Sequence, residues 1–212
     1  MNGRLRQNII LELKDEKLNK MSHHTQEEFV RKLSVEFPNH FNNVKMLEIG
    51  SLNINGSIRK YFNNSTYDGV DLDSGSFSNS TYVGVDLDSG RDVDLICGGH
   101  LVDHEDNTYD TSGSCNCFEH NPYWVETFQN MYRMTKSGGL IFITVPTTGH
   151  PEHGTTRIKP EDSPHTIGKG WDYYSNLTES DFRNKFDIDN MFQNYKFEDN
   201  GLLDLFFYGF KK

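Results

Sequence analysis

The segment from Val44 to Ser57 (VKMLEIGSLNINGS) constrains the fold of this chain more than any other part of it. Its apolar run carries one acid, Glu48, and then breaks at Gly50 and Gly56. A short apolar run that ends in glycine is typical of a buried parallel strand that leads into a tight turn and a helix. Because glycine has no side chain, a ligand can approach the backbone of such a turn closely. The segment therefore predicts an α/β fold with a nucleotide-like ligand at this turn.

Predicted strands and helices alternate along the rest of the chain. The pattern predicts helices over residues 4–20, 25–37, 57–62, 121–136 and 178–186, and strands over residues 44–49, 82–87, 91–96, 140–145, 195–198 and 203–210. The last two strands read as an antiparallel pair. We expect an N-terminal helical segment over residues 1–38 and one α/β domain over residues 39–212, folded as a three-layer sandwich around a mostly parallel sheet.

Capping residues mark the start of three of these helices. Thr25, with Glu28 three residues later, has the pattern of a capping box. Asn121 precedes Pro122, which suits the first position of a helix, and Thr178 precedes the helix over residues 178–186.

One expected central strand has an unusual composition. Asp110–Phe118 lies where a fourth strand should be, but its centre reads Thr-Ser-Gly-Ser. Strands buried on both faces are usually rich in Val, Ile and Leu. The sequence therefore predicts a poor strand here.

Two neighbouring blocks repeat each other at a period of 15 residues. Asn64–Ser78 reads NSTYDGVDLDSGSFS, and Asn79–Val93 reads NSTYVGVDLDSGRDV. Two copies are too few for a solenoid, so a tandem duplication inside one strand-turn unit is the simplest interpretation. Only one copy can supply the second central strand of a single site, and we expect the other to be a surface loop.

An aspartate in each copy is a candidate for binding a ribose. Asp71 lies near the spacing of about 20 residues after the glycine turn that such an acid usually has. Asp86 lies further away, but its copy runs directly into the next predicted strand and has Val83 where the first copy has the charged Asp68. A doubly buried strand should not carry that charge. The pattern favours Asp86 and leaves Asp71 as the alternative.

Charge and cysteine content restrict the class of partner. The net charge of −10 argues against a nucleic-acid backbone as the main partner. No apolar stretch is long enough to span a bilayer, and the first residues do not read as a signal peptide. The odd set of Cys97, Cys115 and Cys117 suggests reduced thiols, so we expect a cytoplasmic location.

Four blocks, taken in order, carry a family resemblance. They are LEIGS with NGS (residues 47–51 and 55–57), YVGVDL (82–87), FEH (118–120) and KSGGLIFITVP (136–146). Together they resemble the class I S-adenosylmethionine-dependent methyltransferases, particularly the small-molecule, type 11-like group. The resemblance implies a Rossmann-like sheet of seven strands with an antiparallel last strand, and S-adenosylmethionine bound beyond the carboxyl ends of the parallel strands.

The same resemblance implies which residues border that cofactor. Glu48 would contact the methionine ammonium through water, Asp86 would accept the ribose hydroxyls, and the backbone at Cys115 would take the methionine amine. Leu87 would lie against adenine, with His100 at its edge. The full implied set is Glu48, Gly50, Ser51, Gly56, Asp86, Leu87, Gly99, His100, Cys115 and Asn116. The family commonly has an acid at the position of Gly98, so adenine here would lack that partner.

The implied reaction needs alignment more than acid–base chemistry. A sulfonium is already an activated leaving group, and a base is required only if the acceptor must lose a proton. For a small-molecule or glycan-like hydroxyl, we predict His120 and His153 as the catalytic bases, since both follow central strands at the rim that faces the cofactor. A locally bonded structural histidine is the alternative for His120.

Other functions stay open at this point. His150, Glu152 and His153 have spacing that can bind zinc, but no fourth ligand is evident, so the sequence predicts no metal. Gly98 and the polar strand would also fit a non-catalytic cofactor-binding or protein-interaction module on a decayed methyltransferase fold. A nicotinamide-dependent oxidoreductase is disfavoured by the absence of GxGxxG.

Overall fold

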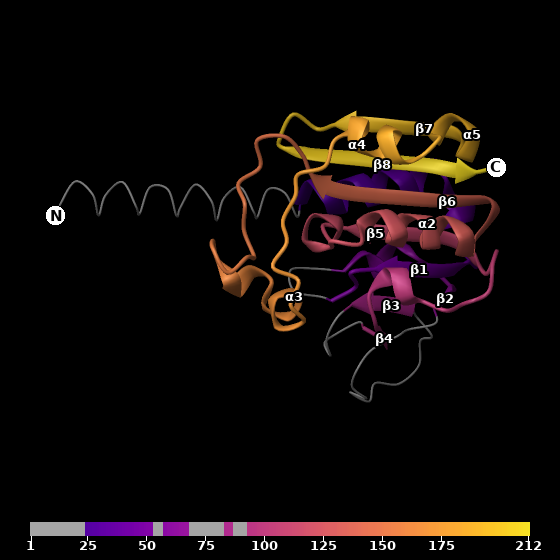
Figure 1. The fold of residues 1–212 in the computed structure, drawn as a ribbon. Coiled ribbons are helices and arrows are strands. Elements are labelled where there is room, and N and C mark those ends of the chain that lie inside the picture. The colour runs from indigo at the N-terminus through magenta and orange to yellow at the C-terminus, as the bar shows by residue number, and fades with distance from the viewer. Residues whose placement is uncertain (1–23, 53–56, 68–82, 87–92) are drawn as a thin grey trace.

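One sheet forms the centre of the molecule. The computed structural model describes residues 24–52, 57–67, 83–86 and 93–212 (Figure 1). Its strands are β1 (Lys45–Ile49), β2 (Thr66–Tyr67), β3 (Val83–Asp86), β4 (Leu95–Ile96), β5 (Tyr109–Cys115), β6 (Thr135–Pro146), β7 (Phe192–Asp199) and β8 (Asp204–Lys211). They run in the order β4-β3-β1-β5-β6-β8-β7, with β2 also paired to β1. β8 pairs antiparallel with both β6 and β7, as predicted for the last strand, and the other pairings among the described strands are parallel.

Helices cover both faces of this sheet (Figure 1). They are α2 (Trp124–Met134), α3 (Pro164–Gly168), α4 (Glu179–Lys185), α5 (Ile188–Met191) and the short 3-10 helices η1 (Pro38–His40), η2 (Ile58–Tyr61), η3 (Gly99–Leu101), η4 (Phe118–His120) and η5 (Pro160–Asp162). A further helix occupies residues 24–36.

Two apolar cores lie on opposite faces of the sheet. Alternate residues of β6 enter different cores: Ile141 and Ile143 face α2 and α4, whereas Leu140 and Phe142 face the helix over residues 24–36. This arrangement confirms the predicted three-layer α/β sandwich. Among the described residues the sheet has eight strands instead of the seven expected, because two short strands fill one position beside β1.

Helix ends agree with the sequence only in part. Thr178 is the N-cap of α4, as predicted, and Asp181 completes a capping box that the sequence analysis did not predict. The capping box predicted at Thr25 is wrong, because residue 24 is already helical and the Thr25 hydroxyl donates to Asp204 at 3.1 Å instead. Asn121 accepts a hydrogen bond from the Tyr123 N–H at 2.8 Å, and the helix begins one residue later. The helix predicted over residues 4–20 lies outside the described residues.

The polar strand β5 is fully formed, which corrects the prediction of a poor strand. Its hydroxyls are buried but all are hydrogen-bonded: Thr111 donates to the His40 carbonyl at 2.8 Å, and Ser114 donates to the Ile49 carbonyl at 2.9 Å. Ser112 shares a 2.7 Å hydrogen bond with Thr135. Buried polar groups that find such partners cost little stability. The sequence showed the polar residues but not these partners.

The strands β2 and β3 occupy one position in the sheet. Met46 pairs with Tyr67, and the next residue of β1, Leu47, pairs with Val83. Successive residues of β1 thus pair with residues of the two repeat copies in continuous parallel register. The second copy supplies the strand beside the carboxyl half of β1 and ends it with Asp86. Asp71 lies outside the described residues.

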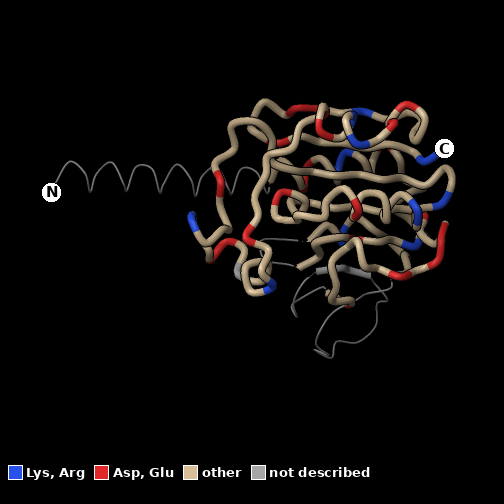
Figure 2. Tube along the Cα trace, in the orientation of Figure 1, with Lys and Arg blue, Asp and Glu red and all other residues tan. Residues whose placement is uncertain are grey.

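Basic and acidic residues are mixed along the described part of the chain. Figure 2 shows Lys and Arg interspersed with Asp and Glu along the chain. Within the described residues, none of the helices has the length and apolar character that a membrane span requires.

Candidate functional site

The carboxyl ends of β1, β3, β4 and β5 meet at one edge of the sheet, because these strands are parallel neighbours. Glu48 is buried near the end of β1, Asp86 ends β3, and Cys115 ends β5. Parallel α/β sheets bind ligands at this edge. The structure therefore brings together residues that are far apart in the sequence, as the resemblance implied. Gly56 and Leu87 lie outside the described residues.

The turn after β1 requires glycine for two reasons. Gly50 has a φ of +77°, and a Cβ atom built on it would lie 2.5 Å from the Cβ of Cys117. The turn therefore packs directly against the segment that follows β5. The next residue, Ser51, is buried, and its hydroxyl has no hydrogen-bond partner among the described residues. An unpartnered buried hydroxyl fits a polar ligand at this turn.

The end of β5 offers acceptors to such a ligand. Asn116 has a left-handed backbone (φ 46°), and its N–H already donates to the Thr144 carbonyl at 2.9 Å. Its side-chain Oδ1 is buried with no partner in the described part of the chain. Burial raises the pKa of the neighbouring Cys115 thiol to about 12, so this residue adds no negative charge at neutral pH. An ammonium group would suit the free amide oxygen of Asn116.

A cluster of three aromatic rings lies beside η3. The His100 ring stacks on Tyr123 at 4.3 Å between centroids, and Trp171 lies 5.9 Å from His100. A Cβ atom on Gly98 would lie 2.5 Å from Cε1 of His100, so the acid common in the family would collide with this ring. Sequence analysis missed Tyr123 and Trp171, because they approach His100 only through the fold.

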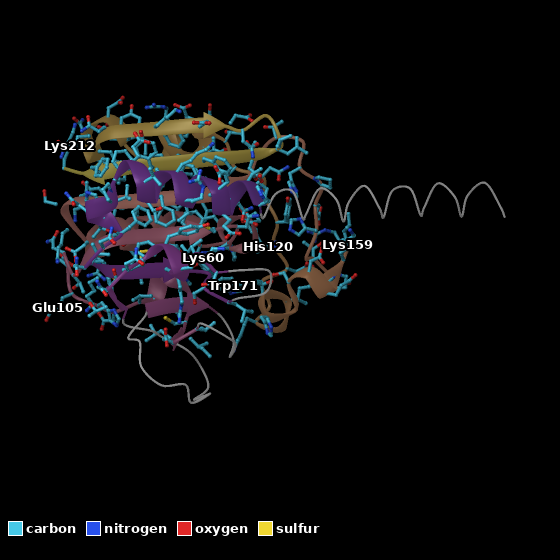
Figure 3. The ribbon with its side chains drawn as sticks, turned by 180° about the vertical axis from the view of Figure 1, so that it is seen from behind. Lys60, Glu105, His120, Lys159, Trp171 and Lys212 are labelled. Atoms are coloured by element: carbon cyan, nitrogen blue, oxygen red, sulfur yellow. The ribbon has the colours of Figure 1, made fainter. Side chains whose placement is uncertain are left out.

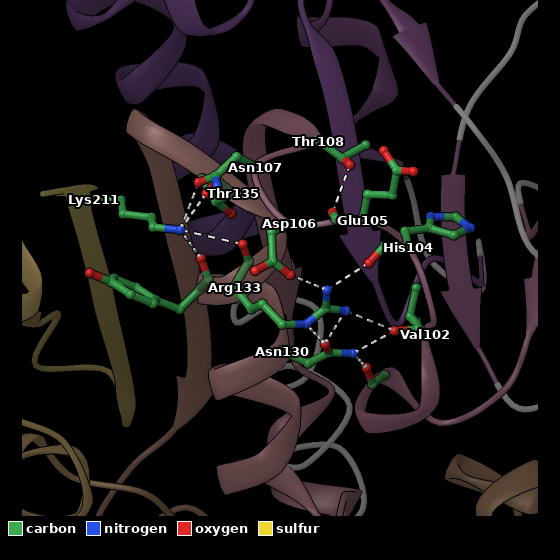
Figure 4. A network of polar contacts seen from close by, with 12 residues as sticks. Val102, His104, Glu105, Asp106, Asn107, Thr108, Asn130, Arg133, Thr135 and Lys211 are labelled. Atoms are coloured by element: carbon green, nitrogen blue, oxygen red, sulfur yellow. Dashed lines mark hydrogen bonds and ion pairs between the residues drawn. The ribbon is translucent and has the colours of Figure 1, made fainter.

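Helix α2 holds η3 in this position. The Asn130 amide donates to the carbonyls of Gly99 and Val102, each at 2.9 Å. The Arg133 guanidinium donates to the His104 carbonyl at 2.7 Å and to the Asp106 carboxylate at 2.6 Å (Figure 4). Hydrogen bonds from α2 to backbone carbonyls along the segment therefore fix the position of Gly99 and His100.

A second cluster contains the predicted catalytic histidines. The ring centroids of His120 and His153 lie 4.9 Å apart, and His150 is 5.3 Å from His153. The Tyr174 hydroxyl lies 3.0 Å from Nδ1 of His150. His120 comes from η4 after β5, whereas His153 comes from the loop after β6. Figure 3 shows His120 at the same end of the molecule as Trp171, away from Glu105 and Lys212.

Burial sets the protonation of this histidine cluster. Burial, followed by the nearby His153, lowers the pKa of His120 to about 3. The ring is therefore neutral at pH 7, and it is a weak base for removing a proton from a hydroxyl. The neighbouring Glu119, which sequence analysis missed, is 1% exposed, and burial raises its pKa to about 8. Its Oε2 atom has no hydrogen-bond partner among the described residues.

Glu152, the acid that the sequence analysis grouped with His150 and His153, is hydrogen-bonded to other residues. Glu152 accepts hydrogen bonds from Thr155 at 2.7 Å and from Arg157 at 2.8 Å. Arg157 also lies 3.4 Å from Asp172, so its charge is balanced at the surface. Glu119, unlike Glu152, belongs to a group with His120 and His153 whose ligand atoms lie within 4.8 Å of one another.

Residues 47–143 match the model of the family described as "Methyltransferase domain". Curated protein sequences gave no significant match to this chain.

Solved structures share the fold at low identity. A Haemonchus contortus phosphoethanolamine N-methyltransferase 2, complexed with phosphomonomethylethanolamine and S-adenosylhomocysteine, aligns with a TM-score of 0.56 and 17% identity over 87% of this chain and 53% of that one. This chain thus spans about half the length of that enzyme. The PH0226 protein of Pyrococcus horikoshii gives 0.55 and 11% over 90% and 92% of the two chains.

A Burkholderia thailandensis 1,6-didemethyltoxoflavin-N1-methyltransferase aligns with a TM-score of 0.50 and 14% identity over 98% of this chain and 87% of that one. Its structure contains 1,6-didemethyltoxoflavin and S-adenosylhomocysteine. At these identities the similarity establishes the fold, while the functional residues must be argued from the chain itself.

Proposed function

We propose that this chain, whose residues 47–143 match the methyltransferase-domain model, is a class I S-adenosylmethionine-dependent methyltransferase that transfers a methyl group to a small-molecule or glycan-like acceptor. Three solved structures of this fold contain S-adenosylmethionine or S-adenosylhomocysteine, and two of them also contain a small acceptor. The class of acceptor is our own proposal for this chain.

The observation that carries the proposal is the glycine turn at the carboxyl edge of the sheet. Gly50 has a backbone that other residues rarely adopt, and it lies against Cys117 with no room for a side chain. Around it, the hydroxyl of Ser51 and the amide oxygen of Asn116 are buried without partners among the described residues. Polar groups that are buried and unsatisfied in the absence of a ligand indicate where a polar ligand binds.

We assign the parts of the cofactor by the chemistry of the residues at this edge. Asp86 would accept hydrogen bonds from the ribose hydroxyls, while Glu48 and the Asn116 amide oxygen would receive the methionine ammonium. His100, stacked on Tyr123, would lie at the adenine edge. When bound, S-adenosylmethionine supplies an electrophilic methyl group.

The chain contributes alignment and exclusion of water to this reaction. We place the acceptor beside His120, whose ring contacts those of His153 and Tyr174. His120 is neutral at pH 7 and can accept a hydrogen bond from an acceptor hydroxyl, but its low pKa makes it a poor proton acceptor. We therefore assign alignment of the acceptor as its main role, and alignment alone can supply several kcal/mol.

Isothermal titration calorimetry with S-adenosylhomocysteine tests the proposal. The native chain should bind this product, and Asp86→Ala should weaken binding by about 10- to 100-fold, because one charged hydrogen-bond acceptor is worth roughly 1.5–3 kcal/mol. Asp103→Ala is the matched control, since Asp103 is exposed and lies after η3, away from the strand ends. Failure of the native chain to bind at millimolar ligand would remove the proposal.

A non-catalytic cofactor-binding module is the second candidate. The weak basicity of His120 favours it, because an unactivated hydroxyl needs a base. Tight binding of S-adenosylmethionine, without methyl transfer to a panel of amine, carboxylate, phenol and sugar acceptors, would support this second function over the first.

A further inference from the structure

We propose that Glu119, His120 and His153 form a binding site for a divalent transition-metal ion, with zinc as the best fit. One ligand atom from each residue lies within 4.8 Å of the other two. The site joins two separate segments: Glu119 and His120 belong to η4, after β5, and His153 belongs to the loop after β6. No ligand set of this kind was predicted from the sequence, because the two segments are more than thirty residues apart.

The hydrogen bonds of each ring leave a nitrogen available. Nδ1 of His153 lies 3.2 Å from the Pro151 carbonyl, so it carries the proton and leaves Nε2 as an acceptor. Nδ1 of His120 is buried and has no hydrogen-bond partner in the described part of the chain. A backbone carbonyl that fixes the tautomer of a metal-binding histidine is a common second contact in zinc proteins.

Glu119 gives the independent observation. Its side chain is 1% exposed, and its Oε2 has no partner among the described residues. An ordinary buried polar cluster satisfies its members by bonding them to one another. Here Oε2 of Glu119 and Nδ1 of His120 are both buried without a partner in the described part of the chain, and ligand atoms of the two residues lie within 4.8 Å of each other, which is an arrangement that a cation would complete.

The chemistry of the three groups suits zinc. Two imidazole nitrogens and one carboxylate are a frequent zinc set that leaves a fourth position for water or a substrate. Zinc ligands about 2.1 Å from the metal lie roughly 3.4 Å from one another in a tetrahedron, so the three side chains need to close by about 1 Å or slightly more. Metal binding would require the neutral imidazole of His120 and the ionised carboxylate of Glu119.

The position of the site suggests what the open coordination position would hold. We expect the acceptor to bind beside these histidines. The metal would therefore bind an acceptor oxygen and lower the pKa of an acceptor hydroxyl. This role rests on the proposed methyl transfer. The metal site itself does not. With a His120 nitrogen bound to the metal, the metal instead of the imidazole would hold and activate the acceptor oxygen.

Metal content of the full chain tests the site. We would purify the chain without a histidine tag, add zinc, remove the excess by gel filtration, and measure zinc by inductively coupled plasma mass spectrometry. About one zinc per chain is expected, with at least a tenfold loss of affinity in Glu119→Gln and in His153→Ala. His24→Ala is the control, because His24 is exposed on the helix over residues 24–36, and it should retain zinc.

Cobalt(II) provides a spectroscopic readout of the same site. Tetrahedral coordination gives strong visible absorption, which should appear in the native chain and in His24→Ala but be lost in His153→Ala. Circular dichroism checks that each variant is folded, and His153, which is only partly buried, is the safer substitution. Less than about a tenth of a zinc per chain, or unchanged zinc in folded His153→Ala, would overturn the proposal.

S-adenosylhomocysteine binding in the same samples separates the two proposals. We expect His153→Ala to lose zinc and keep S-adenosylhomocysteine. A chain that binds zinc but no S-adenosylhomocysteine would leave the metal site standing and remove the proposed function, and the reverse result would remove the metal site alone.

Discussion

Gly113 lies in the middle of β5, directly opposite Phe142 on β6. A Cβ atom on Gly113 would lie 2.2 Å from Cζ of the Phe142 ring, and the ring cannot move aside because it is itself fully buried. We therefore expect Gly113→Ala to reduce the free energy of unfolding by about 1–3 kcal/mol through overpacking. Urea denaturation followed by circular dichroism would measure this change.

Two variants make that prediction specific. Gly168→Ala is the matched control, because a Cβ atom there meets no heavy atom within 4 Å, and it should leave stability nearly unchanged. In a Phe142→Leu background, the cost of Gly113→Ala should fall, because the colliding ring atoms are gone. Equal costs in both backgrounds would show that the ring is not the cause.

The end of α2 shows how one element is completed by another. The Lys211 ammonium, at the end of β8, donates to the carbonyls of Tyr132 at 2.8 Å and Thr135 at 2.7 Å, and to the Asn107 side chain at 3.1 Å (Figure 4). These carbonyls belong to the last turn of α2 and the residue after it, where a helix has no backbone donors of its own. A cation also interacts favourably with the negative end of the helix dipole.

We expect Lys211→Met to reduce the free energy of unfolding by about 1–2 kcal/mol, since it removes these hydrogen bonds and leaves carbonyls unpaired. Thermal or urea unfolding would measure the loss. Lys196→Met is the control, because Lys196 is an exposed lysine paired with Glu198, and exposed ion pairs contribute little. A loss of similar size in both variants would count against a helix-capping role for Lys211.

The elements that the sequence predicted well are those with local signals. The Thr178 N-cap and the closing pair β7–β8 need only residues close in the chain, and both are present. The sequence could not predict that β5 forms a complete strand, because its Ser112 and Ser114 hydroxyls are hydrogen-bonded to residues on other elements. Glu119 escaped notice for the same reason: its importance comes from His153, which only the folded chain brings close.

At the scale of the whole molecule, the strand register predicts that one copy of the 15-residue repeat can be removed while the sheet is kept. Met46 and Leu47 are consecutive in β1, and their partners Tyr67 and Val83 keep the same register although residues 68–82 separate them in the chain. Joining Tyr67 directly to Val83 would regenerate one copy of the repeat (STYVGVDLDSG) and one continuous strand in place of β2 and β3. The sheet would then have seven strands, with Asp86 in its present position.

We therefore expect deletion of residues 68–82 to give a folded chain that is at least as stable as the native one, because a shorter connection costs less entropy to close. It should also bind S-adenosylhomocysteine as the native chain does, since Asp86 remains. Deletion of residues 69–82 is the matched control. It leaves Asp68 as one extra residue, which either forms a bulge or moves every side chain of the strand to the opposite face. That control should lose about 1–3 kcal/mol in urea unfolding relative to the longer deletion. Equal stability of the two deletions would contradict the continuous register from which the prediction is drawn.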